Sequence, residues 1–333
     1  MLKETIYSIK SPYRQSMDIT AYTFGGGEPS CCIVGALRGN EIQQMAICAQ
    51  LVNTLKRLEE NGCLVDGKRI MIIPCANYYS MNIGKRFWTM DNTDINRMFP
   101  GYDQGETTQR IADGLFKSIC DYKYGVQMAS FYLEGEFLPH IKMMDTGSGK
   151  QETYESLTDF GLPYGIIRTP IPYDTATLNY NWQVWGCHAF SMFAAYTDHI
   201  GRQSTQTAVN SVLRFLIAKG IIKWTLHPGS HTRIIKEESM CNMQTTFAGI
   251  LKKHAKAGED VNEGDLLCEI SHPLEGHTLG RIVSPINGTV FFAYNKQLVM
   301  EHTDVFKIVP SVEVGATGAA AGGARRVQLW MDV

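Results

Sequence analysis

Apolar runs that read as buried strands alternate with amphipathic helices through the first two thirds of the chain, and this alternation most constrains the fold. Residues 31–34 (Cys-Cys-Ile-Val) and 69–74 (Arg-Ile-Met-Ile-Ile-Pro) are short apolar runs typical of buried strands. Apolar side chains at helical spacing predict helices over residues 41–60, 107–122 and 205–219. Strands that alternate with helices favour an α/β domain over residues 1–223, built on a mixed, mostly parallel sheet flanked by helices.

The character of the sequence changes near residue 224. Short strand-like runs separated by Gly, Pro and Asn fill residues 224–310, a pattern typical of a small all-β barrel or sandwich. Residues 257–265 (Ala-Gly-Glu-Asp-Val-Asn-Glu-Gly-Asp) and 284–288 (Ser-Pro-Ile-Asn-Gly) resemble a biotinyl/lipoyl-type hammerhead. No Lys stands at the modified position, so we expect a structural relative and not a carrier. Residues 311–333 form a low-complexity Ala/Gly tail to which we assign no function.

Composition and charge exclude several classes of partner. The 333 residues include 31 basic and 33 acidic side chains, so the net charge of −2 provides no basic field for nucleic acid or an anionic membrane. No apolar run approaches the ~20 residues that span a bilayer, and the N-terminus lacks the apolar segment of a secretory signal. Nine cysteines without a Cys-x-x-Cys pair favour reduced thiols over disulfides or a thiolate metal site. We therefore expect a cytoplasmic protein.

The first motif with chemical content is Val34-Gly-Ala-Leu-Arg-Gly-Asn-Glu41, a strand that runs through a glycine turn into a helix. Arg38 and Glu41 are three residues apart at this junction. Their side chains are therefore expected at the carboxyl end of the sheet, where open α/β sheets build their sites.

The second motif is Asp91-Asn-Thr-Asp-Ile-Asn-Arg-Met-Phe-Pro-Gly101. Asn96 and Arg97 offer an amide and a bidentate guanidinium next to a rigid Phe-Pro-Gly turn, a combination suited to a carboxylate. The alternative is a structural ion pair between Asp94 and Arg97 on a surface loop.

Taken in order, these motifs resemble the succinylglutamate desuccinylase/aspartoacylase family. That family has Gly-x-x-His-Gly-Asn-Glu, then Asp-Leu-Asn-Arg-x-Phe-Pro-Gly, a strand that ends in Asp-Leu-His-Ser, a Pro-Tyr-x-x-Arg segment, a Thr-Leu-Glu and a C-terminal β domain. Residues 35–41, 94–101 and 163–168 match the first, second and fourth of these segments. The resemblance covers roughly residues 15–310. It implies a zinc-carboxypeptidase-like domain followed by a smaller all-β, barrel-sandwich-like domain.

The resemblance also locates the zinc ligands of the family, and the chain departs from them. Arg38 and Ala129 stand where the family has His ligands, and Phe193 stands where it has the Glu that acts as general base. Glu41 is the one ligand position retained. A catalytic zinc needs three protein donors, whereas a guanidinium stays protonated and only donates hydrogen bonds. We therefore expect no zinc here and a salt bridge between Arg38 and Glu41 in its place.

The residues that grip a substrate carboxylate in the family are present. Asn96, Arg97 and Arg168 match those positions, and Arg38 would add a positive charge beside them. The resemblance therefore implies an anion-binding cleft.

A rearranged metal site is an alternative, with His140 near Glu134 and Glu136, or His188, as its ligands. A single His beside a proline is more often a packed or capping residue than a ligand. Cys187 and His188 do not form a nucleophile–base pair, because neighbours on a strand point to opposite faces.

Two functional hypotheses follow. The residues favour a non-catalytic protein that binds a small carboxylate-bearing ligand, needs no cofactor, and has neither nucleic acid nor a membrane as its partner. The alternative is a metal-dependent hydrolase of a small N-acyl amino acid or a C-terminal amide, with Glu41 and His140 as catalytic candidates and zinc at a rearranged site. Assembly into a homo-oligomer through the β domain is a further hypothesis.

Overall fold

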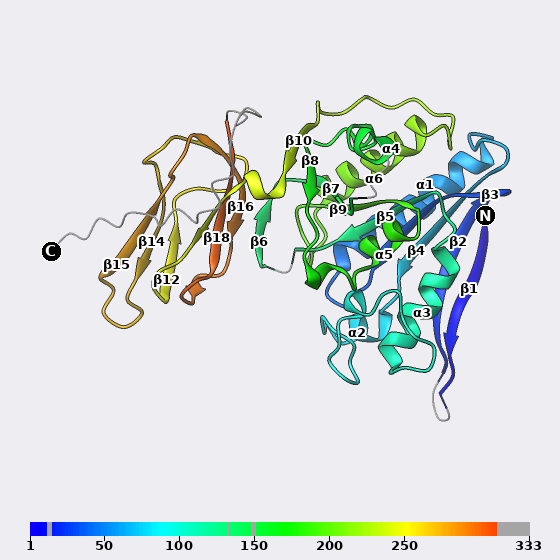
Figure 1. Cartoon of the computed structure of the whole chain (residues 1–333), viewed down its shortest axis with the longest axis horizontal. Coiled ribbons are helices and arrows are strands. Elements are labelled where there is room, and N and C mark those ends of the chain that lie inside the picture. The colour runs from blue at the N-terminus through cyan, green and yellow to red at the C-terminus, as the bar shows by residue number, and fades with distance from the viewer. Residues whose placement is uncertain (12–14, 132, 148–150, 312–333) are drawn as a thin grey trace. The chain divides into compact units, whose positions relative to one another are not determined.

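The computed structural model describes residues 1–11, 15–131, 133–147 and 151–311 (Figure 1). The chain divides into two compact units. Of the described residues, those within 1–131 and 139–237 form unit 1, and those within 133–138 and 238–311 form unit 2. The sequence predicts a domain boundary between residues 223 and 224. The predicted tail, from residue 312 onward, lies outside the described residues.

Unit 1 is built on a mixed nine-stranded sheet. In spatial order its strands are β1 (Leu2–Ile9), β2 (Met17–Gly25), β4 (Lys68–Cys75), β3 (Glu28–Ala36), β5 (Tyr124–Ala129), β9 (His188–Phe193), β7 (His140–Met144), β8 (Tyr164–Arg168) and β10 (Arg233–Lys236). The central strands β4, β3, β5 and β9 are parallel, whereas β1, β2 and β7 introduce antiparallel pairs. The predicted mixed α/β sheet is confirmed.

Helices cover both faces of this sheet. They are α1 (Ile42–Glu60), α2 (Tyr78–Asn82), α3 (Thr107–Ile119), α4 (Gln151–Glu155), α5 (Leu178–Val184) and α6 (Arg202–Ala218). Successive side chains of a strand point to opposite faces, and β3 shows the consequence. Cys31 and Ile33 pack in the cluster that contains α1 and α6, while Cys32 and Val34 pack in the cluster that contains α3 and α5. Burial on both faces explains why β3 is an uninterrupted apolar run.

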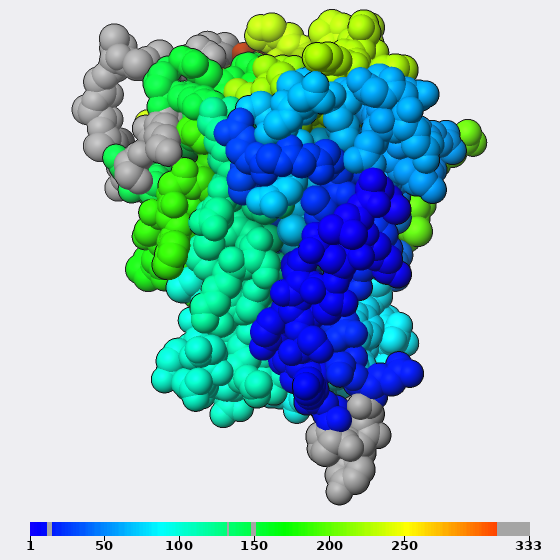
Figure 2. Space-filling model, turned by 90° about the vertical axis from the view of Figure 1, so that its right-hand side faces the viewer, coloured from blue at the N-terminus to red at the C-terminus, as the bar shows by residue number. Residues whose placement is uncertain are grey.

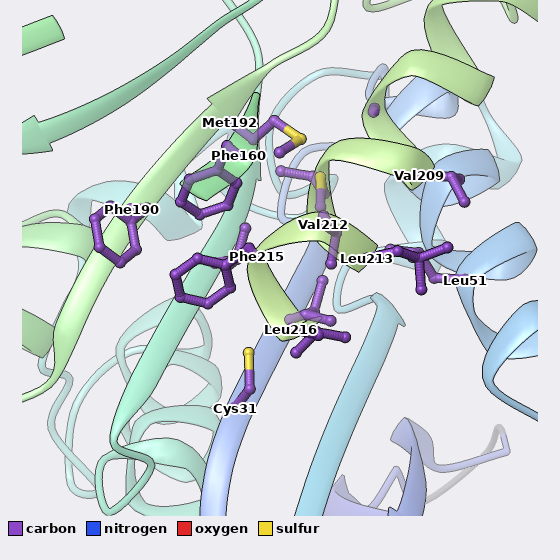
Figure 3. Close-up of a cluster of buried hydrophobic side chains, with 14 of the residues drawn as sticks. Cys31, Leu51, Phe160, Phe190, Met192, Val209, Val212, Leu213, Phe215 and Leu216 are labelled. Carbon is purple, nitrogen blue, oxygen red and sulfur yellow. The ribbon is translucent and has the colours of Figure 1, made fainter. Parts of the chain in front are cut away.

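The cluster between the sheet and α6 is rich in aromatic rings (Figure 3). Phe215 of α6 stacks on Phe160 with ring centroids 4.4 Å apart, and Phe190 of β9 meets both rings edge-on. All three side chains are fully buried. Aromatic pairs in these geometries add stability beyond the burial of their area.

The N-terminal strand β1 lies beside α3, and both are visible on the face shown in Figure 2. Gly114 of α3 permits this contact, because a Cβ there would lie 2.0 Å from the ring of Tyr7. Ser118 Oγ, one turn further along α3, donates a hydrogen bond to the carbonyl of Ile6 at 3.3 Å.

Unit 2 contains two antiparallel sheets around one apolar core. The first holds β11 (Cys241–Gln244), β18 (Asp304–Pro310), β16 (Gly288–Tyr294) and β13 (Asp260–Val261), and the second holds β15 (Thr278–Val283), β14 (Leu266–Ser271), β12 (Gly249–Lys253) and β17 (Leu298–Val299). The predicted C-terminal all-β domain is confirmed. Sequence analysis did not foresee β6 (Gly135–Phe137), which leaves the middle of the chain and pairs with β16.

Two findings bear on the expected partners and redox state. Within the ranges that the structure describes, no helix has both the length and the apolar character needed to cross a membrane. All nine cysteines lie in those ranges and none forms a disulfide. Burial raises the pKa of the Cys268 thiol to about 12, so it stays protonated.

Phe215→Ala is expected to lower the free energy of unfolding by about 3–5 kcal/mol, because it removes a fully buried ring from the aromatic cluster. Denaturant unfolding followed by tryptophan fluorescence measures the change. Ile200→Ala, which truncates a side chain that is 58% exposed just before α6, is the control and should change stability by no more than about 0.5 kcal/mol. Equal losses in the two variants would contradict the packing described here.

Candidate functional site

The turn between β3 and α1, residues 37–41, forms one wall of the candidate site. Gly39 sits at its centre and packs closely against the chain around α2. A Cβ at this position would lie 2.2 Å from the carbonyl oxygen of Lys85, so only glycine fits. The backbone N–H of Gly39 also donates to the carbonyl of Arg86 at 3.0 Å. The turn is therefore held in one conformation.

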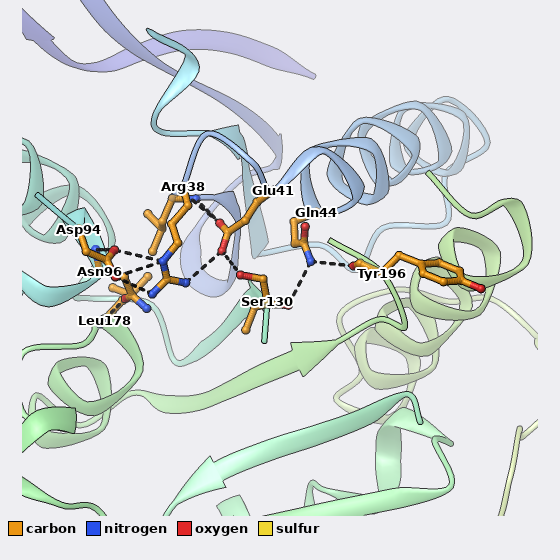
Figure 4. Close-up of polar contacts among 10 residues, drawn as sticks. Arg38, Glu41, Gln44, Asp94, Asn96, Ser130, Leu178 and Tyr196 are labelled. Atoms are coloured by element: carbon orange, nitrogen blue, oxygen red, sulfur yellow. Dashed lines mark hydrogen bonds and ion pairs between the residues drawn. The ribbon is translucent and has the colours of Figure 1, made fainter. Parts of the chain in front are cut away.

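Glu41 is fully buried, and hydrogen bonds occupy both of its carboxylate oxygens (Figure 4). Oε2 accepts the backbone N–H groups of Leu37 at 2.9 Å and Arg38 at 3.0 Å. Oε1 accepts from Arg38 Nη1 at 3.1 Å and from Ser130 Oγ at 2.5 Å. The N-terminus of α1, which begins at the next residue, also favours a negative charge here. Four donors saturate this carboxylate without a metal ion.

The guanidinium of Arg38 bridges two carboxylates. Its Nη1 makes the predicted salt bridge with Glu41. Its Nε lies 3.1 Å and its Nη2 lies 2.8 Å from Oδ2 of Asp94. Arg38 is only 6% exposed. Burial by itself would lower the pKa of Arg38, but the charges of Glu41 and Asp94 outweigh it and the net pKa is raised. Arg38 therefore keeps its positive charge at every accessible pH.

Asp94 forms its ion pair with Arg38 and not with Arg97. The sequence analysis left open an ion pair with Arg97, whereas the structure pairs Asp94 with Arg38. Oδ1 of Asp94 also accepts the N–H of Asn96 at 3.0 Å and so caps the short helix η1 (Ile95–Arg97). Sequence reasoning missed two residues of the network, Asp94 as the partner of Arg38 and Ser130 as a donor to Glu41.

Arg97 forms no ion pair with any residue in the described part of the chain. Its guanidinium carbon lies 3.8 Å from the centre of the Tyr173 ring, a cation–π contact that leaves the edge of the fork available. Its Nε is buried and has no hydrogen-bond partner among the described residues. Tyr173 is 63% exposed, so the pair lies close to solvent.

The loop that carries these residues is fixed at both ends. Oδ1 of Asn96 accepts the backbone N–H of Leu178 at 3.1 Å and so anchors the start of α5. Gly101 closes the loop with a φ of +100°, and a Cβ there would lie 2.0 Å from the backbone nitrogen of Asp113. Both features explain why Asn and Gly occupy these positions.

Arg168, the third predicted anion ligand, is already paired with carboxylates of the protein. It ends β8, where its Nε lies 2.9 Å from Asp174 and its Nη1 lies 3.0 Å from Glu237. Burial lowers the pKa of Arg168, but these two charges and their hydrogen bonds outweigh it and raise the pKa. The structure thus brings Arg38, Glu41 and Asp94 together in one network, while Arg168 belongs to a second one.

Aromatic packing surrounds the position that the resemblance assigns to the general base. Ala129 and Phe193 face each other as Cα partners at the ends of the parallel strands β5 and β9. The ring of His140 stacks on Phe193 with centroids 4.6 Å apart, and Phe131 meets it edge-on. His140 is fully buried in this packing.

The donors around Glu41 do not fit a zinc ion held by two imidazoles and a carboxylate. Across the described residues, the side chains of His, Cys, Asp and Glu form one group of three that could share an ion, and Glu41 is not in it. His188 is engaged elsewhere, with Nδ1 2.7 Å from Thr153 Oγ1 and Nε2 3.3 Å from Glu152. These residues therefore support no metal-dependent step at this position.

The carboxylates that were expected near His140 belong to unit 2. Glu136 lies in β6 opposite Ala293, and Glu134 forms an ion pair with Lys296 at 2.8 Å.

Comparison with known proteins identifies the relatives of the chain. Residues 28–124, which include the segments 35–41 and 94–101, match the model of the succinylglutamate desuccinylase/aspartoacylase catalytic domain. Over these residues the chain is similar to this family. Among curated relatives, the N-alpha-acetyl-L-2,4-diaminobutyric acid deacetylase of Halomonas elongata is 22% identical over 264 residues, which span 74% of this chain and 71% of the relative.

Solved structures show the same fold. A succinylglutamate desuccinylase from Silicibacter sp. TM1040 superposes with a TM-score of 0.77 at 18% identity and covers 92% of this chain and 93% of its own. The product-bound ectoine utilization protein EutE (DoeB) from Ruegeria pomeroyi gives a TM-score of 0.76 at 19% identity, with 93% and 94% covered. The family's fold therefore extends over both units of this chain.

Arg38→Met is expected to lower the free energy of unfolding by about 3–5 kcal/mol, because it leaves the buried carboxylate of Glu41 without its countercharge. Lys117→Met is the matched control. It removes a cation that is 64% exposed from its pair with Asp113, and ion pairs exposed to water contribute little to stability. Urea titration of both variants gives the two losses. A loss for Arg38→Met no larger than the control's would contradict the buried network.

Proposed function

We propose that this family member binds a small carboxylate-bearing ligand and does not hydrolyse it at the Glu41 position. The observation that carries the proposal is the hydrogen-bonded pair of Arg38 and Glu41. Every oxygen lone pair that Glu41 could offer to a metal already accepts a hydrogen bond. The fixed positive charge of Arg38 beside it repels a divalent cation. A family mechanism that activates water on zinc has no support from these donors.

Arg97 and Asn96 support the binding half of the proposal. Arg97 is a planar cation with no acidic partner in the described chain, and it is oriented by the ring of Tyr173. The side-chain oxygen of Asn96 is used by Leu178, so its amide N–H groups are the part that can face a ligand. A carboxylate on the fork of Arg97 would supply the missing acceptor for its buried Nε. Arg38 adds positive charge, and Arg168 takes part only if it releases Asp174 or Glu237.

The alternative is a metal-dependent hydrolase of a small N-acyl amino acid or a C-terminal amide, with zinc at a rearranged site. The Halomonas elongata relative is a deacetylase, and this favours the alternative. A rearranged metal site would disrupt contacts present in this chain. Glu41 would have to lose its hydrogen bonds from Arg38 and Ser130, and His140 would have to leave its stacking position on Phe193. For this reason we rank it second.

A ligand test separates the two functions. N-alpha-acetyl-L-2,4-diaminobutyric acid and succinate, titrated separately by calorimetry, serve as carboxylate probes, and product release from the acetylated probe is followed by mass spectrometry. We expect at least one probe to bind without turnover, and Arg97→Met to weaken that binding at least tenfold because a bidentate ion pair is lost. Arg202→Met, which removes an exposed arginine at the start of α6, is the control and should leave affinity unchanged.

Zinc-dependent release of acetate would overturn the non-catalytic proposal and favour the hydrolase. Equal affinity of Arg97→Met and the parent protein would remove Arg97 from the site.

Restoring the family's donors is a second test. The double variant Arg38→His, Ala129→His supplies two imidazoles beside Glu41 and is expected to bind zinc at least tenfold more tightly than Arg38→His alone. Chelator competition measures both affinities, and circular dichroism confirms that both variants are folded. A folded double variant with no gain in zinc affinity would show that Arg38 and Ala129 are not at the ligand positions.

A further inference from the structure

A group of metal-binding side chains lies on the hairpin turn between β14 and β15 of unit 2. His272 and His277 stand at the two ends of this turn, and the N–H of His272 donates to the carbonyl of His277 at 2.8 Å. Glu275 lies between them on the turn. One ligand atom from each of the three side chains lies within 4.8 Å of the other two, and no other group of three in the described ranges meets this condition.

The three side chains are arranged to face one another. The rings of His272 and His277 are nearly parallel, with an interplanar angle of 8° and centroids 5.1 Å apart. Oε2 of Glu275 lies 3.3 Å from Nδ1 of His277. Two ligand atoms on a tetrahedral zinc lie about 3.4 Å apart when each bond is about 2.0–2.1 Å. The spacing of this pair therefore already matches a shared ion.

We propose that His272, Glu275 and His277 bind one divalent transition-metal ion, of which Zn²⁺ is the representative, with water in the remaining positions. Two imidazoles and one carboxylate form a donor set suited to zinc, copper and nickel. The site has no role in the proposed ligand binding around Arg97 and does not depend on it.

The hairpin also limits the affinity of this site. Nδ1 of His272 accepts the backbone N–H groups of Glu275 at 3.1 Å and Leu274 at 3.4 Å. A neutral imidazole has one free lone pair, so an ion must displace these long hydrogen bonds or bind after the ring has turned. The side chain of Leu274 is 91% exposed and His272 is only half-buried, so water reaches the turn. The site is therefore expected to bind more weakly than closed structural zinc sites.

Within the described ranges, no other histidine that lies beside a carboxylate has a third metal-binding side chain close enough to share an ion. His254 of unit 2 lies 3.2 Å from Glu269, but Arg281 and Lys252 compete for that carboxylate. His254→Ala is accordingly the matched control, because it removes an imidazole with one acidic neighbour from the same unit.

The test uses the whole chain stripped of metal with a chelator and then titrated with Zn²⁺ by calorimetry, and separately loaded with Cu²⁺ for electron paramagnetic resonance. The parent protein and His254→Ala should each bind one ion on the hairpin. His272→Ala and His277→Ala should lose at least tenfold in affinity, and the copper spectrum should change from two coupled nitrogens to one. The side chains are at the surface, so unchanged melting temperatures without metal will show that the variants fold.

Unchanged zinc affinity in both hairpin variants, or no binding by the parent protein at millimolar Zn²⁺, would overturn the proposal. The result also shows where in the chain a bound zinc ion lies. One ion that is lost in His277→Ala belongs to the hairpin, whereas one ion retained in His277→Ala would have to lie elsewhere and would reopen the hydrolase alternative.

Discussion

The buried cluster of Arg38, Glu41 and Asp94 is the interaction on which the rest of the site depends. It joins three segments that are distant in sequence, because Glu41 belongs to the turn after β3, Asp94 to the loop before α3, and Ser130 to the end of β5. Burying Arg38 and Glu41 and partly burying Asp94 is costly unless each charge is paired and hydrogen-bonded. The network meets that condition with backbone and side-chain donors, and it thereby fixes the geometry of the surrounding loops.

The same network changes the chemistry that the family's fold can support at this place. A zinc site concentrates positive charge at one atom and leaves a position for water. A guanidinium spreads its charge over a plane and donates hydrogen bonds in fixed directions. The guanidinium of Arg38 therefore fits the proposed recognition of a planar anion. It is poorly suited to lowering the pKa of a water molecule.

The sequence predicted those parts of the fold whose signal is local. Strands β3 and β4 were foreseen from their uninterrupted apolar runs, and helices α1, α3 and α6 from apolar residues at helical spacing. Short elements were missed. β6 is only three residues long, Gly135–Phe137, and is a strand only because Phe137 pairs with Phe292 far along the chain.

In the candidate site, too, only the contacts between residues close in sequence were predicted. The salt bridge of Arg38 with Glu41 was predictable, because the two residues are three apart on one turn and opposite in charge. The role of Asp94 was not, since its pairing with Arg38 and not with the nearby Arg97 is decided by how the loop folds back on the sheet. Arg168 pairs with Glu237, which follows β10 and is also far from Arg168 in sequence. Glu237 belongs to no recognisable motif, so this pairing could not be predicted either.

The pairing of β6 (Gly135–Phe137) with β16 of unit 2 has a consequence for how the chain can be divided. Unit 2 is made of two separate stretches of polypeptide, so no single cut of the backbone yields both units whole. A truncation after residue 237 would leave β6 attached to unit 1 with none of its hydrogen-bonding partners, an unpaired edge prone to aggregation. During synthesis, β6 is also made long before β16, so the two strands cannot pair until β16 has been synthesised.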